Sequence, residues 1–263
     1  MKILVLGGTG MLGSAVTRHF SAYYDNVAST SRGQFDALKD NFDVLPTGFD
    51  YVINCIGVIK HFMERDPAGA IAVNALFPWR LAGWCEKSGA KLIHISTDCV
   101  YSGQKGKYVE SDPHDALDAY GKTKSLGECY GRAMVLRTSI IGEEIGSGVS
   151  LLAWTKRQKG KTVGGYVNHF WNGVTTDRYA QICDQIIRGR LYETGLFHIY
   201  AADDVSKHDM LLMFDRRYNL GLSVLPKTPT PAIDRTLRTE KALCAKLNIP
   251  TVEQMINEMT VYE

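Results

Sequence analysis

Hydrophobic and polar positions follow two different periods along the first half of the chain. Short runs that are almost entirely apolar have the length of buried strands, and they cover residues 2–7, 26–30, 50–57, 91–96 and 133–139. Stretches with apolar residues at helical spacing separate them, at 11–23, 66–89 and around 118–128. Strands that alternate with helices and are apolar on both faces are typical of parallel sheets. The pattern therefore predicts an α/β fold, a Rossmann-type doubly wound parallel sheet with helices on both faces.

The pattern is less regular after residue 142, but it still predicts further elements. Helical spacing indicates helices at 150–160, 175–189, 205–218 and 251–259, and one apolar run indicates a strand at 196–200. Thr175 and Ser206 are predicted N-caps, because their hydroxyls suit the free N–H groups at a helix start. The prolines within 226–231 predict a rigid surface connection.

Composition excludes several classes of protein. The chain has 263 residues, of which 45% are hydrophobic, and this suits one large globular domain. No apolar run approaches the roughly 20 residues that span a bilayer, and the N-terminal apolar run is shorter than a signal peptide requires. We therefore expect a cytoplasmic protein without a membrane partner. The net charge of +2 favours no nucleic acid, and one short basic stretch is interpreted as a solvated helix end, at Lys156, Arg157, Lys159 and Lys161. Six scattered Cys and seven His show no ligand spacing, so no metal site is predicted.

A glycine-rich turn directly follows the first predicted strand. The stretch "GGTGMLG" places Gly7, Gly10 and Gly13 three residues apart, where the next helix begins. Glycines at such a turn allow the backbone to approach a pyrophosphate, and the helix N-terminus supplies N–H donors. The strand-turn-helix context favours a dinucleotide site over a glycine turn without ligand. Its predicted cofactor-binding residues are Gly7, Thr9, Gly10, Met11, Leu12 and Gly13.

The residues after the second and third strands refine the cofactor prediction. "STSRG" offers Ser31 and Arg32 and no carboxylate, which suits the 2′-phosphate of NADP(H), with NAD(H) as the alternative. The competing interpretation is an exposed loop arginine. "NCIG" ends the third strand, and its Cys55, Ile56 and Gly57 are expected to lie against the cofactor.

Tyr120 and Lys124 stand four residues apart, on one face of the predicted helix. On its own this pair is as consistent with an exposed helix face as with a catalytic pair. Thr97, at the end of the fourth strand, is expected at the same edge of the sheet. A positive charge beside a phenol lowers its pKa, so Tyr120 is predicted to act as an acid–base group. Lys124 would tune it and hold the cofactor ribose, and Thr97 would hold the substrate oxygen.

Together these motifs resemble the extended short-chain dehydrogenase/reductases, and within them the dTDP-4-dehydrorhamnose reductase family. The matching stretches lie within residues 1–142 and include "GGTGMLG", "ISTDCVYSG" and "DAYGKTKSLGE". The resemblance implies a catalytic triad at Thr97, Tyr120 and Lys124 and a nucleotide-sugar substrate. We accordingly expect 1–142 to be an NAD(P)-binding core. We expect 143–263 to complete the sheet in part, and in part to form a small substrate-binding lobe.

The resemblance leaves several points open. Ile140 and Ile141 replace an aromatic residue that is common in the family, which leaves the sugar undetermined. Candidate substrate-binding residues are Asn168, Trp171, Asn172 and Arg235, for which ordinary loop structure is the alternative. The favoured function is NADPH-dependent reduction of a nucleotide-linked 4-keto-6-deoxy sugar for surface polysaccharide biosynthesis. An NAD-dependent epimerase and a non-catalytic, cofactor-binding regulatory subunit are the alternatives, and a homodimer is left open.

Overall fold

The fold is organised around one parallel six-stranded sheet. The structure, a computed structural model, describes residues 1–144 and 148–261. The strands lie in the order β10-β5-β4-β3-β1-β2, and every neighbouring pair is parallel. Their bounds are β1 (Ile3–Leu6), β2 (Val27–Thr30), β3 (Tyr51–Asn54), β4 (Lys91–Thr97), β5 (Met134–Thr138) and β10 (Gly195–His198). The predicted doubly wound parallel sheet is confirmed.

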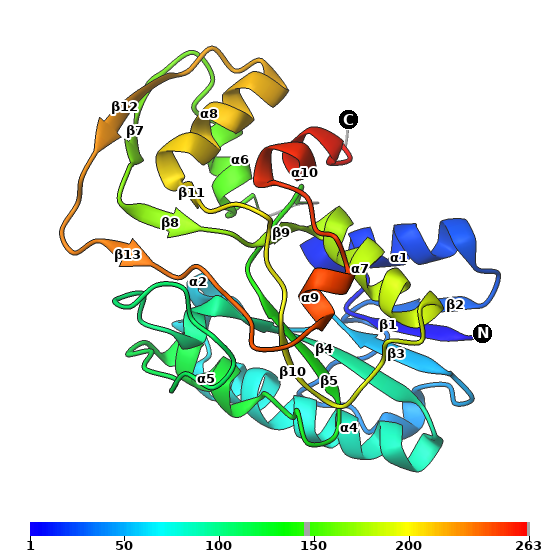
Figure 1. Ribbon diagram of the computed structural model, residues 1–263. Coiled ribbons are helices and arrows are strands. Elements are labelled where there is room, and N and C mark those ends of the chain that lie inside the picture. The colour runs from blue at the N-terminus through cyan, green and yellow to red at the C-terminus, as the bar shows by residue number, and fades with distance from the viewer. Residues whose placement is uncertain (145–147, 262–263) are drawn as a thin grey trace.

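Helices cover both faces of this sheet because its strands are apolar on both sides. α1 (Met11–Tyr23) and α7 (Thr176–Arg188) lie on one face, and α4 (Phe77–Ser88) lies on the other (Figure 1). Successive side chains of a strand point to opposite faces. Val5 accordingly packs in the core with α1 and α7, whereas Leu4 and Leu6 pack with α4.

The segment 66–89 is helical throughout residues 67–88, as the pattern predicts, but it contains a π-helical turn. It consists of α3 (Pro67–Ile71), a π-helical turn η2 (Ala72–Leu76) and α4, and it ends at Gly89 with a left-handed φ of 76°. π-Turns occur mostly as insertions within α-helices, often at functional sites. Here the turn contains Asn74, whose amide bonds both the N–H and the C=O of Val58 at 2.8 Å. The helix is therefore tied to the loop that follows β3.

The chain beyond β5 adds three small sheets and several helices beside the main sheet (Figure 1). The small sheets pair β6 (Ile140–Ile141) with β9 (Val174–Thr175), β7 (Thr162–Tyr166) with β12 (Ser223–Lys227), and β8 (His169–Trp171) with both β11 (Val205–Ser206) and β13 (Ile233–Asp234). The remaining helical elements are η1 (Phe42–Val44), α2 (Lys60–Met63), η3 (Asp98–Val100), α5 (Ala119–Leu126), α6 (Leu151–Lys156), α8 (Lys207–Tyr218), α9 (Leu243–Lys246) and α10 (Val252–Glu258).

Of the local predictions for this second half, the two helix caps are confirmed and the proline segment is wrong in part. Thr175 and Ser206 cap α7 and α8 as predicted, with their side chains accepting backbone N–H groups. The prediction that residues 226–231 form only a connection was wrong in part, because Pro226 and Lys227 belong to β12. A strand tolerates proline at a sheet edge, where its missing N–H costs no ladder hydrogen bond, and β12 belongs to a sheet of only two strands.

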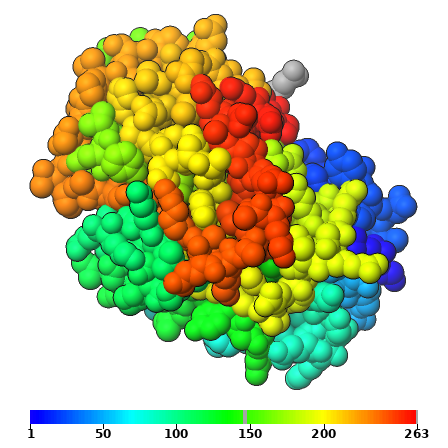
Figure 2. Space-filling model, in the orientation of Figure 1, coloured from blue at the N-terminus to red at the C-terminus, as the bar shows by residue number. Residues whose placement is uncertain are grey.

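The C-terminal segment connects the two parts of the molecule. Residues of the 230s and 240s, in orange, run across the face of the molecule shown in Figure 2. Tyr108 pairs with Leu237 in an isolated bridge, and its C=O accepts the N–H of Arg238 at 2.7 Å. These contacts hold the loop after β4 against the chain that follows β13. No helix among residues 1–144 and 148–261 is long and apolar enough to cross a membrane.

Candidate functional site

The glycine-rich turn between β1 and α1 has the geometry that a pyrophosphate site requires. Gly7 adopts a φ of 80°, a conformation that suits glycine. A Cβ on Gly13 would lie 2.0 Å from the carbonyl oxygen of Gly7, so only glycine permits the close packing of helix and strand. Gly10 caps α1 without any side-chain hydrogen bond. The first N–H groups of α1, which include those of Met11 and Leu12, are thus not capped by a side chain and suit an anionic group.

A cavity of about 480 Å³ opens beside this turn. Seven of the predicted cofactor-binding residues line it: Gly7, Thr9, Gly10, Arg32, Cys55, Ile56 and Gly57. Ser31 does not line it, and its hydroxyl donates to Gln34 Oε1 at 2.9 Å. Tyr120 and Lys124 also lie outside the lining, nearer to the end of β4. The cavity thus brings most of the predicted cofactor-binding residues together, and their binding role stays a prediction.

Asp36 and Arg65, two further charged residues, line this cavity with Arg32. Its side chain is 79% exposed, and Nε lies 3.4 Å from Asp36 Oδ2. The N–H of Leu38, which donates to Asp36 at 3.0 Å, holds the pKa of that carboxyl below its usual range. Arg65 lines the cavity from the turn between α2 and α3. The prediction rested on the residues at the end of β2 and missed both, because Asp36 lies six residues beyond that strand and Arg65 comes from another segment.

The three predicted catalytic residues converge at the carboxyl end of β4. Thr97 is the last residue of that strand and is buried. Tyr120 comes from α5, and the Thr97 side chain lies close enough to its hydroxyl to lower the pKa of the phenol. Lys124, one turn further along α5, is also buried, and its ammonium donates to the carbonyl oxygen of Ile95 at 2.9 Å. The predicted spacing thus places a phenol, an ammonium and a hydroxyl at one edge of the sheet.

The local sequence explains how α5 comes so close to the sheet. Asp118 caps the helix by accepting the N–H of Gly121 at 2.8 Å. A Cβ on Gly121 would lie 2.2 Å from the carbonyl oxygen of Cys99, in the turn after β4. Glycine between Tyr120 and Lys124 is therefore a packing requirement of this site.

The electrostatics of the tyrosine differ from the expectation. Burial raises the pKa of Tyr120, while the hydrogen bond from Thr97 lowers it by less. The ammonium of Lys124 donates to the carbonyl oxygen of Ile95. Burial lowers the pKa of Lys124 to about 8, against an opposing effect of Glu128. The pKa of Tyr120 is therefore raised in this state, and the phenol stays protonated at neutral pH. That Lys124 tunes the tyrosine stays a prediction.

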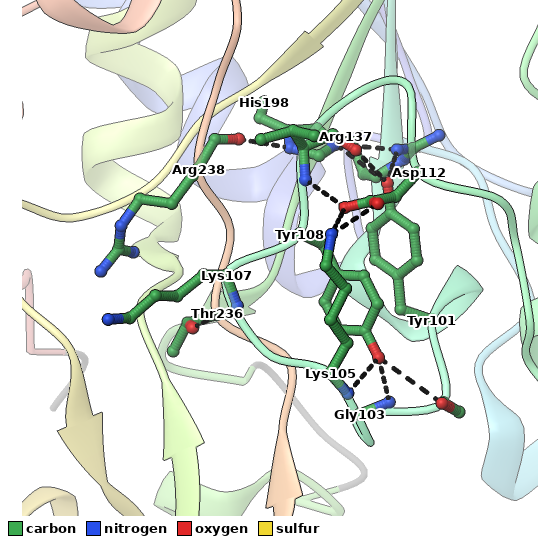
Figure 3. Close-up of polar contacts among 12 residues, drawn as sticks. Tyr101, Gly103, Lys105, Lys107, Tyr108, Asp112, Arg137, His198, Thr236 and Arg238 are labelled. Carbon is green, nitrogen blue, oxygen red and sulfur yellow. Dashed lines mark hydrogen bonds and ion pairs between the residues drawn. The ribbon is translucent and has the colours of Figure 1, made fainter.

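A buried polar network that the sequence did not reveal lies behind this edge. Arg137, on β5, is fully buried and binds both carboxylate oxygens of Glu128 at 2.8 and 2.6 Å. Figure 3 shows Arg137 beside Tyr101 and His198; its Nη1 bonds the tyrosine hydroxyl and lies 2.7 Å from His198 Nε2. Burial lowers the pKa of His198 to about 4, so its neutral ring can accept this bond. Ser96, next to Thr97, donates to Glu128 and joins the network to the catalytic strand.

The four candidate substrate-binding residues lie in different surroundings. Asn172 is buried and bonds Asp204 and the backbone of Leu237, and so holds the C-terminal segment. Asn168 donates to the carbonyl oxygen of Pro229 at 2.7 Å. Trp171 is buried, whereas Arg235 binds the carbonyl oxygens of residues 101 and 102 and acts on the pKa of Asp98. Of the four, Arg235 is the one shown to lie near the catalytic strand, and the substrate role of all four stays a prediction.

Comparison with known families identifies the protein's relatives. The profile of the RmlD substrate binding domain family matches residues 1–238. The chain belongs to this family. Relatives include the methionine adenosyltransferase 2 subunit beta of Danio rerio, 27% identical over 94% of this chain and 84% of that protein. They also include the dTDP-4-dehydrorhamnose reductase of Streptomyces griseus, 35% identical over 48% of this chain and 43% of that one.

Solved structures support the family assignment at the level of the fold. The dTDP-4-dehydrorhamnose reductase of Bacillus anthracis, solved in complex with NADP, superposes with a TM-score of 0.81. It is 19% identical, and the match covers 98% of both chains. The predicted resemblance to the dTDP-4-dehydrorhamnose reductases is confirmed, and oxidoreductases of this name are among the relatives. NADP in this relative agrees with the cofactor class predicted from the sequence.

Proposed function

We propose that this protein is an NADPH-dependent reductase that acts on the 4-keto group of a nucleotide-linked 4-keto-6-deoxy sugar, in surface polysaccharide biosynthesis. The observation that carries the proposal is the meeting of Thr97, Tyr120 and Lys124 at the carboxyl end of β4. Ligands of doubly wound sheets bind at this edge. The family match and the reductases among the relatives support the same reaction.

The glycine turn and the cavity fit the dinucleotide that this reaction needs. Gly7, Gly10 and the start of α1 would hold its pyrophosphate, and Arg32 and Arg65 would face the adenosine phosphate. Lys124 would hold the ribose with its ammonium. NADPH, when bound, supplies the hydride that adds to the keto carbon.

Tyr120 is the proton donor of the proposed reduction. Addition of a hydride to the carbonyl carbon leaves negative charge on the oxygen, and the Tyr120 hydroxyl gives that oxygen a proton. The raised pKa of Tyr120 keeps the phenol protonated before this step. Transfer is still favourable, because an alkoxide is a far stronger base than a phenolate. The hydroxyl of Thr97, which donates to Asp98 in this structure, would turn its one donor to the same oxygen when the substrate binds. Solvent returns the proton to the tyrosine.

The direct test is consumption of NADPH in the presence of a panel of nucleotide-linked 4-keto-6-deoxy sugars. We expect turnover that Tyr120→Phe lowers by about 10²–10⁴-fold, since general acid catalysis contributes that much. Binding of NADPH should survive in the variant, as followed by fluorescence titration. Tyr130→Phe is the matched control, because Tyr130 is exposed on the surface, and it should leave turnover unchanged. Near-wild-type turnover of Tyr120→Phe would exclude this mechanism.

A regulatory subunit is the second candidate function. Relatives that match over 94% of this chain are named as a subunit of methionine adenosyltransferase 2. A subunit of this kind would bind the cofactor without turning over any sugar nucleotide. It would change the activity of a partner enzyme, and the Tyr120→Phe variant would change that activity as much as the wild type does.

The absorbance of the purified protein tests the epimerase alternative. An epimerase requires a retained nicotinamide and no net consumption of NADPH.

A further inference from the structure

Three charged side chains gather beside the catalytic threonine. Asp98 follows Thr97 in the chain, is only 5% exposed, and accepts a hydrogen bond from the Thr97 hydroxyl at 3.1 Å. Lys207, the first residue of α8, and Arg235, the residue after β13, act electrostatically on this carboxylate. The two cations thus come from the C-terminal part of the chain, and the carboxylate comes from the catalytic edge of the sheet.

In the part of the chain that the structure describes, the ammonium of Lys207 has a sulfur and no oxygen as its hydrogen-bond acceptor. Its ammonium lies 3.7 Å from the sulfur of Met210 and 5.4 Å from the ring centre of Trp171. A thioether is a weak acceptor, while an ammonium carries three strong donors. Lys207 forms no ion pair among residues 1–144 and 148–261, and Asp98 acts on its pKa by charge alone, without a hydrogen bond. Its donors remain available to a ligand that brings oxygen atoms.

Arg235 is held in place with donors to spare. Its Nε donates to the carbonyl oxygen of Tyr101 at 2.8 Å, and Nη2 donates to that of Ser102 at 3.2 Å. A guanidinium has five N–H donors in one plane, so these two bonds fix its orientation and leave others free. The cluster therefore presents two positive charges against the single negative charge of Asp98, and the surplus favours an anion.

We propose that Lys207, together with Arg235, binds the diphosphate of the nucleotide-linked substrate, with Asp98 separating the two cations from the catalytic hydroxyl. This inference rests on the proposed function. The diphosphate is the anionic group that every such substrate carries, and phosphoryl oxygens form strong, charge-assisted bonds with ammonium and guanidinium groups. The pyrophosphate of the cofactor has its own place at the Gly7–Gly13 turn, which shares no residue with this cluster.

Binding of the diphosphate alone tests the proposal. Calorimetric titrations with dTDP, UDP, GDP and inorganic pyrophosphate would use protein that is already saturated with NADPH, so that the cofactor site is filled. We expect Lys207→Met to weaken binding by about 10- to 100-fold, the usual effect of losing a hydrogen bond to a charged group. Lys207→Arg should retain most of the affinity. Lys246→Met removes an exposed lysine and serves as the control. Affinity for NADPH, measured first, reports that each variant is folded.

The pH dependence gives a second readout that a merely structural lysine would not change. Burial lowers the pKa of Lys207, with Asp98 and Cys99 raising it and Arg235 lowering it further. Diphosphate affinity should therefore fall as pH rises through this lowered pKa. Lys207→Arg should remove that fall, because arginine stays charged.

The possible results separate this inference from the proposed function. If Lys207→Met binds every diphosphate as tightly as wild type, the inference is wrong while the reductase function stands. The inference is equally overturned if wild type binds none of the four probes, or if the variant loses affinity only for complete sugar nucleotides. If wild type binds them through Lys207 but reduces no keto sugar, the site stands and the proposed reaction fails.

Discussion

Glu128 binds Arg137 through both of its carboxylate oxygens, at 2.8 and 2.6 Å, where neither side chain is more than 1% exposed. Glu128 follows Lys124 by four residues and also accepts the Ser96 hydroxyl. The ion pair thus joins the end of α5 to β4 and β5, the elements that position the catalytic residues.

Removal of one partner of this pair should strongly destabilise the protein. Arg137→Met leaves the Glu128 carboxylate buried without its counter-ion, and such changes typically cost about 3–5 kcal/mol. Urea unfolding followed by circular dichroism measures the change. Arg216→Met is the matched control, because the Arg216–Glu253 pair is roughly half exposed and should contribute less than about 1 kcal/mol. Equal effects of the two substitutions would show that the buried pair has no special weight.

Gly121→Ala should damage both stability and catalysis. The new methyl group would lie 2.2 Å from the Cys99 carbonyl oxygen, so α5 must move away from the turn after β4. Overpacking of this kind costs about 1–3 kcal/mol, and the shift would displace Tyr120 and Lys124. Gly131→Ala is the control, since no atom lies within 4 Å of its added Cβ. A Gly121→Ala protein with wild-type melting temperature and turnover would contradict the packing argument.

The use of NADPH should decline in alkaline solution because of Lys124. Burial lowers the pKa of this lysine to about 8, so the ammonium is present below that pH and is lost above it. If the ammonium holds the ribose, kcat/KM for NADPH should fall as pH rises through about 8. Tyr120 does not titrate in this range, because burial raises its pKa.

Lys124→Met provides the comparison for this profile. The variant should bind NADPH more weakly at neutral pH and should lack the alkaline fall, because it has no ammonium to lose. A wild-type profile that stays flat well above pH 8, or a variant that keeps the fall, would assign the titration to another group.

Cofactor choice should depend on Arg32. Arg32→Asp replaces a cation on the cavity wall by a carboxylate next to Asp36, which would repel a 2′-phosphate. We expect the ratio of NADPH to NADH affinity to fall by about 10- to 100-fold, in line with the loss of charged hydrogen bonds. Fluorescence titration with each cofactor measures the ratio, and Arg190→Asp, outside the cavity, is the control. An unchanged ratio, or a wild type that already prefers NADH, would show that Arg32 does not select the cofactor.

The sequence by itself determined the features that depend on local geometry. The period of apolar residues indicated strands and helices, because it is set by backbone geometry over a few residues. Gly7, Gly10 and Gly13 signalled a turn against a helix start, and the caps at Thr175 and Ser206 were readable because a cap bonds within its own first turn. The spacing of Tyr120 and Lys124 predicted a shared helix face for the same reason.

Only the tertiary structure decided which distant residues meet, and therefore how the site is charged. In the sequence, Glu128 and Arg137 look like ordinary charged residues. Their burial depends on the packing of α5 on the sheet, which removes both side chains from water. The direction of the Tyr120 pKa shift is set mainly by burial of the phenol, which its spacing from Lys124 could not predict. Asp98 stands more than a hundred residues before Lys207 and Arg235 in the chain. Asn172 bonds the backbone of Leu237, a contact that no local pattern predicts. Burial and long-range contact set the strength of electrostatic interactions, and neither is encoded in a short stretch of sequence.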